Sequence, residues 1–331
     1  MVKFIPVRYQ HHDYHDNIKI KPEIQEVTCN LGTDNLERTT SCKFLSLHTD
    51  PSIVWTKVWN RYPQKKEKMR NSKILPEFPT IFKNFEKYMN GSKEKCVSIL
   101  WSSEQWSEEF AGFLVMLTEK KEIKPERIKV IEIHSPFDKY CDYSLKTFFE
   151  RYLIFENEIL KSFPSADIVI ENQYTHKGKE KFGNFLLSNK DDIIKLASLI
   201  KDNKLKLRLV LDIPQLFSTY YGNRLLLKNE VEGFLTPLKE CRNFIKSTHI
   251  WGYDINQKRG AHKADFDTYF GNNLELKKCF INEICDLFDD DQKRYFVPEV
   301  DDRTKIKSIV TDLIEESKVG GKRRIEFVSS D

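Results

Sequence analysis

The stretch Asp167-Ile-Val-Ile-Glu-Asn172 carries the pattern that decides the fold. A short run of apolar, mostly β-branched residues leads directly into polar residues, which is typical of a buried strand that ends at a functional edge. The stretch Leu209-Val-Leu-Asp212 repeats the pattern. We therefore predict a parallel sheet whose strands deliver one polar side chain each to a common edge.

The wider sequence supports this prediction, because short β-rich runs alternate with longer amphipathic runs from about residue 95 onward. A length of 331 residues suits one α/β protein of the TIM (β/α)8-barrel type with an irregular N-terminal elaboration. We expect strands at 97–101, 127–133, 167–170, 205–211, 247–250 and 295–297. We expect helices at 108–120, 144–161, 188–200, 231–244, 274–288 and 304–317, with Ser107 and Ser188 as caps of the first and third.

Three regions follow from this pattern. Residues 1–90 form the N-terminal elaboration, which includes the first barrel strand at 43–48. Residues 91–318 form a metal-binding βα barrel. Residues 319–331 form a basic, loosely held tail.

Composition limits the class of protein. Hydrophobic residues make up 40% and charged residues 31%, as in an ordinary globular protein, and no apolar run approaches the ~18–20 residues of a membrane helix. The seven cysteines are scattered without a CxxC pair, which indicates reduced thiols in a cytoplasmic protein. A net charge of +4 allows a DNA or RNA partner without requiring one.

Polar residues that can bind a metal ion stand at or near several predicted strand ends. Because the carboxyl ends of barrel strands open onto one face, we expect these side chains to meet in one pocket. Carboxylate oxygens and imidazole nitrogens suit one or two divalent ions, Zn, Mn, Fe or Mg. Asp212 could instead cap the next helix, and His249 could be a core histidine. The candidate ligands are His134, Glu171, Asp212, His249, His262 and Glu299.

Residues 95–301 resemble the xylose isomerase-like TIM barrels, which include endonuclease IV and sugar isomerases and epimerases. The resemblance rests on 168–172, 209–215, 248–254, 260–267 and 296–300, which suit the fourth to eighth strands. It implies that Glu171 is the strand-four metal-bridging or catalytic glutamate, and that Asp212 and His249 are the ligands of strands five and six. It further implies that His134 is a strand-three ligand, that His262 is the histidine of a later loop, and that Glu299 is the terminal glutamate.

Two positions depart from the family pattern. Gln215 stands where the family has a histidine three residues after the strand-five aspartate, and Gly260 stands where endonuclease IV has an aspartate. Asp265 or Asp267 could take the place of that aspartate. The resemblance therefore implies one or two ions instead of three, and it leaves open a catalytically degenerate barrel.

Three functions remain open, and the basic loops and the large N-terminal elaboration favour the first over the second by a narrow margin. The first is a metal-dependent hydrolase, a phosphodiesterase or endonuclease acting on nucleic acid, with Glu171 and Glu299 as catalytic residues. The second is a sugar isomerase or epimerase that uses Glu171 and Glu299 around one divalent metal. The third is a degenerate barrel that acts as a binding module. A basic, open groove would favour the hydrolase, and a closed acidic cup would favour the isomerase.

The candidate substrate-binding residues are Lys177, Lys179, Gln215, Trp251, Lys258, Arg259 and Asp265.

Overall fold

A computed structural model describes residues 1–9, 18–29, 42–49, 78–80, 100–175, 184–257 and 261–330. Its strands follow the order β2-β3-β4-β5-β6-β7-β8-β1, and β1 also pairs with β2, so the sheet closes on itself. The strands are β1 (Val2–Arg8), β2 (Ile24–Cys29), β3 (Phe44–Thr49), β4 (Ile128–His134), β5 (Asp167–Glu171), β6 (Arg208–Asp212), β7 (Ile245–His249), β8 (Lys293–Val297) and β9 (Ile325–Phe327).

This closed order of eight parallel strands confirms the predicted TIM (β/α)8-type fold. Among the described residues, the helices of four or more residues are α4 (Glu104–Glu119), α5 (Leu145–Ser162), α6 (Lys190–Asp202), α7 (Ile213–Tyr221), α8 (Lys228–Val231), α9 (Phe266–Tyr269), α10 (Leu274–Leu287) and α11 (Arg303–Glu316), with 3-10 helices η6 (Asp138–Cys141) and η8 (Thr236–Phe244). Within the described ranges, no helix is both long and apolar enough to cross a membrane.

The prediction that 43–48 is the first strand is wrong, because β1 and β2 precede it in the sheet and make it the third. Neither strand has the apolar pattern expected of a buried strand, because β1 contains Pro6 and β2 buries the polar residues Gln25 and Glu26. A strand was also predicted at 97–101. Of these residues the structure describes only Leu100 and Trp101, and they form a turn. Glu171, Asp212 and His249 therefore end the fifth, sixth and seventh strands instead of the fourth, fifth and sixth.

Several predicted boundaries change as well. Helix α4 begins at Glu104, because Ser103 caps it by accepting from the N–H of Trp106, while Ser107 lies inside the helix. Helix α6 is capped by Asn189 instead of Ser188. The helix predicted at 231–244 is instead α8 followed by η8, which has Pro237 in its first turn. The tail predicted to be loosely held contains β9, which pairs with β1.

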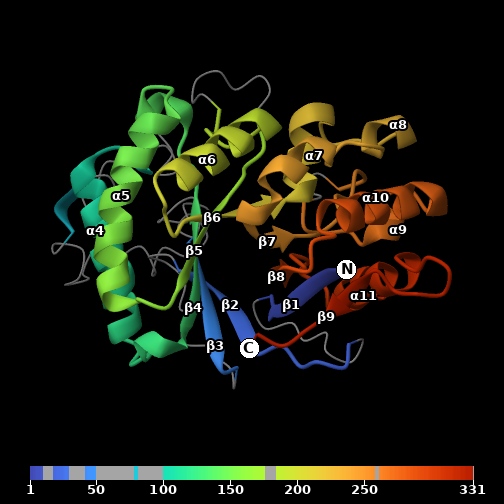
Figure 1. The fold of residues 1–331 in the computed structure, drawn as a ribbon, viewed down its shortest axis with the longest axis horizontal. Helices are drawn as coiled ribbons and strands as arrows, with labels where there is room; N and C mark the ends of the chain where they lie inside the picture. Colours follow the sequence, from blue (N-terminus) through green and yellow to red (C-terminus); the bar gives the residue numbers. More distant parts are fainter. Residues whose placement is uncertain are drawn as a thin grey trace. The chain divides into compact units, whose positions relative to one another are not determined.

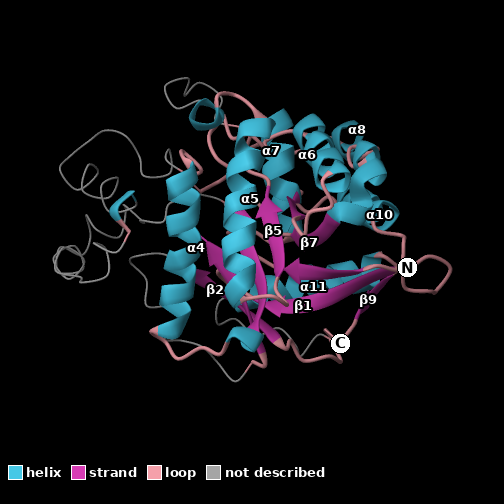
Figure 2. Cartoon of the chain, turned by 60° about the vertical axis from the view of Figure 1, so that its left-hand side comes forward, coloured by secondary structure: helices cyan, strands magenta, loops and turns pink. Residues whose placement is uncertain are grey.

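The chain divides into two compact units. Unit 1 comprises 1–26, 172–174 and 188–331, and unit 2 comprises 27–171 and 175–187. In unit 2, α4 and α5 lie side by side (Figures 1 and 2). Trp101 is fully buried, and its ring centroid lies 5.2 Å from that of Trp106 and 5.4 Å from that of Phe155. The Trp101 indole N–H donates to the backbone carbonyl of His134 at 2.8 Å, so this aromatic core fixes the end of β4.

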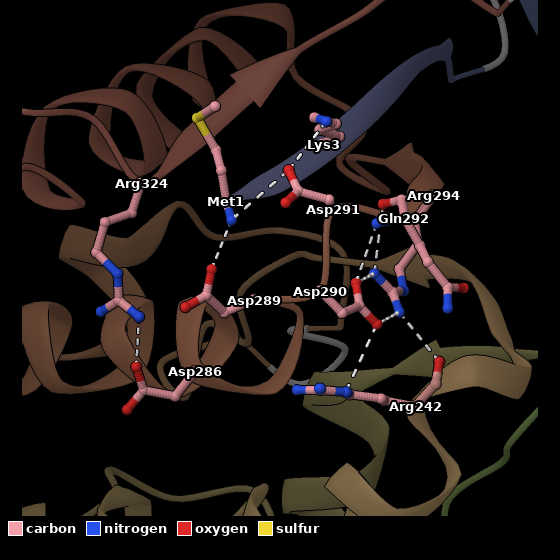
Figure 3. Close-up of polar contacts among 10 residues, drawn as sticks. All are labelled: Met1, Lys3, Arg242, Asp286, Asp289, Asp290, Asp291, Gln292, Arg294 and Arg324. Carbon is pink, nitrogen blue, oxygen red and sulfur yellow. Dashed lines mark hydrogen bonds and ion pairs between the residues drawn. The ribbon is translucent and has the colours of Figure 1, made fainter.

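In unit 1, a buried ion pair holds the turn that leads from α10 into β8 (Figure 3). Arg294 is completely buried, and its two terminal nitrogens each lie 2.6 Å from a different oxygen of Asp290. Arg294 also donates to the carbonyls of Ile245 and Arg242, and its guanidinium lies over the ring of Phe288. The start of β8 is therefore fixed by a bidentate ion pair and by hydrogen bonds from Arg294 to two backbone carbonyls.

The charge of Asp290 is central to this arrangement. Burial opposes its ionisation, but the hydrogen bonds and charge of Arg294, with help from the N–H of Gln292 and the charge of Arg242, more than offset burial and hold the pKa below its usual range. We predict that Asp290→Asn destabilises the protein by ~3–5 kcal/mol at pH 7, because it leaves the buried Arg294 without its counter-charge. Urea unfolding followed by circular dichroism would measure this.

The neighbouring aspartate provides the control. Asp291 is 65% exposed and pairs with Lys3 and the N-terminal amine, so Asp291→Asn should change stability little. Because the pKa of Asp290 is lowered in the folded state, its contribution is present above the unfolded value of ~3.9 and is lost as the pH falls through the folded pKa. Equal stabilities of the two variants at pH 7 would contradict this assignment.

Candidate functional site

Unit 1 contains a group of possible metal ligands, here named the first cluster, made of Asp212, His249 and Glu299. One candidate ligand atom of each residue lies within 4.8 Å of those of the other two. Asp212 ends β6, His249 ends β7, and Glu299 follows β8 after Pro298. Their exposed fractions are 0%, 0% and 4%, so the cluster is buried.

Three N–H groups bind the Asp212 carboxylate. One oxygen accepts from the backbone N–H of Gln215 at 2.8 Å, and the other accepts from Nε2 of Gln215 at 2.8 Å and from the Trp251 indole at 2.9 Å. Asp212 is thus the N-cap of α7, as the alternative interpretation proposed, and it belongs to the ligand cluster as well. The helix α7 itself was missing from the predicted elements, because it begins without any intervening loop.

His262 lies beside the first cluster, next to Glu299. Its Nδ1 is 3.0 Å from the backbone carbonyl of Glu299 and 3.5 Å from the carboxylate, and its ring stacks on Trp251 with centroids 4.2 Å apart. Its side chain is one-third exposed, and its φ of +57° is unusual for a residue other than glycine. A hydrogen bond from Nδ1–H to the carbonyl would leave Nε2 as the nitrogen able to bind a metal.

Unit 2 contains the second cluster, made of His48, His134 and Glu171, in which the candidate ligand atoms also lie within 4.8 Å of one another. Nε2 of His134 is 2.6 Å from the Glu171 carboxylate, and the rings of His48 and His134 are 5.0 Å apart. His48 also lies 3.5 Å from the buried carboxylate of Glu132. His48 was not among the predicted ligands, and it stands one residue before the end of β3, whereas His134 and Glu171 are the last residues of their strands.

The two clusters are chemically suited to divalent ions. Their donors are oxygen and imidazole nitrogen, which bind Zn, Mn, Fe and Mg. Ligands about 2.1 Å from an ion in tetrahedral geometry are roughly 3.4 Å apart. The distance from His249 Nδ1 to the Glu299 carboxylate is 3.4 Å. Two carboxylates buried together, Asp212 and Glu299, are also costly without a nearby positive charge.

The structure describes only some of the predicted substrate-binding residues. Gln215 and Trp251 contact Asp212 directly. Asp265 caps α9 by accepting from the N–H of Thr268, so its described role is structural. Lys177, Lys179, Lys258 and Arg259, together with Gly260, lie outside the described residues.

The first cluster gives a direct prediction about ion binding. Glu299→Gln should lower the affinity for Zn or Co at least ~100-fold, because it removes a charged ligand and replaces it with a weak neutral one. Isothermal titration calorimetry of chelator-treated protein would measure the change. Asp301→Asn is the matched control, since Asp301 is an exposed carboxylate two residues away that pairs with Lys263. Equal losses in both variants would contradict the assignment of Glu299.

No protein-family model matches the chain, and no curated protein matches it. Among solved structures it is similar to a sugar phosphate isomerase/epimerase from Parabacteroides distasonis ATCC 8503, with 12% identity and a TM-score of 0.39 over 94% of this chain and 96% of that chain. A second such protein from the same organism has 9% identity and a TM-score of 0.37 over 96% of each chain. A uronate isomerase from Bacillus halodurans C-125 has 12% identity and a TM-score of 0.36 over 89% and 56%.

Likenesses this distant carry no argument about the reaction, and the fold is established here by strand order and pairing. The chain has the parallel βα-barrel fold that its resemblance to the xylose isomerase-like barrels implied.

Proposed function

We propose that the chain is a divalent-metal-dependent enzyme that acts on a small polar substrate, by a reaction of the sugar isomerase or epimerase type. The burial of the first cluster is the observation that carries this proposal. Asp212, His249 and Glu299 are at most 4% exposed, and Gln215 and Trp251 beside them are at most 9% exposed. A closed, acidic cluster suits a compact substrate better than an extended polyanion.

A nuclease needs cations that bind phosphates. The lysines and arginine predicted for this role lie outside the described residues and favour neither function. In the described part of the loop that follows β7, Lys263 pairs with Asp301 at 2.5 Å. Lys305 donates to the backbone carbonyl of Lys263. These two described cations are therefore engaged within the protein.

Glu299 is the best candidate for moving the proton. In an aldose–ketose isomerisation, a carboxylate takes the proton from the carbon next to the carbonyl and returns it to the former carbonyl carbon, while the hydroxyl proton passes from one oxygen to the other, so no proton is gained or lost overall. A divalent ion held by Asp212, His249 and one oxygen of Glu299 would polarise the substrate carbonyl and make that carbon more acidic, and the second oxygen of Glu299 would then act as the base. Nδ1 of His262 lies 3.5 Å from the Glu299 carboxylate, close enough to help orient it. The catalytic role predicted for Glu171 stays a prediction.

Proton exchange with solvent tests this proposal without knowledge of the natural substrate. We expect the protein loaded with Mg or Zn to introduce deuterium from D2O into one or more members of a panel of aldoses, ketoses and their phosphates. Proton NMR after chelation of the ion would detect the exchange. Measured at an ion concentration that saturates each variant, Glu299→Gln should slow it by ~10²–10⁴-fold, as expected for loss of a general base, while Asp301→Asn should leave it unchanged.

The competing hydrolase activity is measured with the same wild-type and variant proteins. The substrates are duplex DNA, DNA with abasic sites, and single-stranded DNA. Cleavage that depends on Glu299, with no exchange on any sugar of the panel, would replace the isomerase proposal by the hydrolase one.

A further inference from the structure

The local geometry around Asp212 departs from the ordinary pattern of a helix start. Asp212 is the N-cap of α7 and Gln215 is its third residue, which is the arrangement of a capping box. In a capping box, the glutamine side chain reaches back to the backbone N–H of the cap residue. Here that N–H donates instead to Oδ1 of Asn172 at 2.9 Å, and Asn172 donates in return to the Asp212 carbonyl at 3.0 Å.

The Gln215 side chain is therefore available for other partners. Its Nε2 donates to the Asp212 carboxylate at 2.8 Å, and its Oε1 accepts from the backbone N–H of Tyr174 at 3.1 Å. Gln215 is only 9% exposed, so these bonds form away from bulk water. One amide thus joins the carboxylate of a candidate ligand to the segment that follows β5.

The same carboxylate oxygen of Asp212 also accepts from the Trp251 indole at 2.9 Å. Gln215 and Trp251 approach it from different elements, α7 and the loop after β7. Two donors from separate elements, together with the capping bond from the backbone N–H of Gln215, restrict rotation of the carboxylate. A ligand held in this way needs little reordering when an ion binds.

We propose that Gln215 is a positioning residue, which holds the Asp212 carboxylate in the orientation that faces His249 and Glu299. The proposal rests on the proposed role of the first cluster as an ion site. In an ordinary capping box the side chain of Gln215 would bind the backbone N–H of Asp212. Here Asn172 binds that N–H, and Gln215 binds the Asp212 carboxylate instead.

The central experiment compares Gln215→Met with Gln257→Met. Methionine keeps the length of the side chain and removes both hydrogen bonds. Gln257 is a matched control, because its Nε2 donates at 2.7 Å to Asp254, also an aspartate three residues earlier, but it is exposed. We expect Gln215→Met to weaken binding of Co by about 10–100-fold, the usual effect of losing a partner of a metal ligand. It should also alter the visible absorption spectrum of the bound Co, whereas Gln257→Met should do neither.

A double-mutant cycle separates positioning from a general structural effect. Trp251→Phe removes the second donor to the same oxygen, so its effect on Co affinity should be coupled to that of Gln215→Met. Purely additive losses, or wild-type affinity and spectrum in Gln215→Met, would overturn the proposal.

A measurement without any ion makes the two proposals distinguishable. The indole N–H of Trp251, assigned in proton NMR by its absence in Trp251→Phe, should exchange faster with solvent in Gln215→Met than in Gln257→Met, because the accepting carboxylate is less well fixed. Unchanged exchange would overturn the positioning role even if ions bind. If the wild-type protein binds no ion while this exchange still responds, the ion site and the proposed function fail, and Gln215 is left with a structural role only.

Discussion

Two carboxylates, Asp212 and Glu299, are buried close together in unit 1, and much of the surrounding structure compensates for that arrangement. A buried negative charge is tolerated only where hydrogen-bond donors or positive charges surround it. Asp212 is surrounded by N–H donors from α7 and Trp251, whereas Glu299 has two imidazoles within about 3.5 Å. The first environment fixes a ligand, and in the second the carboxylate and the imidazole of His249 have the spacing of two ligands of one ion. The two carboxylates are thus prepared for different tasks within one cluster.

Sequence reasoning recovered the fold class because the later strands are short, apolar and regularly spaced. It also found five of the six cluster residues, since each stands at or just beyond a strand end. It missed β1 and β2, because Pro6 breaks the expected strand pattern in the first sequence and buried polar residues break it in the second. With those strands missing, the turn at Leu100–Trp101 was mistaken for a strand, and strand positions relative to the family shifted by one. His48 was not predicted, because it stands one residue before the end of its strand and the strand-end pattern does not mark it.

Other features could not have been found from one sequence. A glutamine three residues after an aspartate is an ordinary helix start, and only the position of Asn172, forty residues earlier, changes its meaning. The stacking of His262 on Trp251 likewise depends on a loop that returns to its own strand end. The three aspartates at 289–291 look alike in sequence, yet Asp290 is buried against Arg294 while Asp291 is exposed. In each case the deciding partner is distant along the chain, and local patterns carry no information about it.

Strand β8 shows how these features are distributed. Arg294 lies near its start and Glu299 lies just beyond its end, so four residues separate a structural anchor from a candidate ligand. A strand of this length advances roughly 3.3 Å per residue, which puts the two side chains on opposite ends of the sheet. Substitutions around Asp290 and Arg294 can therefore tune the robustness of the protein while the chemistry stays the same. A new activity could in turn be built at the Glu299 end without rebuilding the anchor, which makes this strand a natural place to begin engineering the barrel.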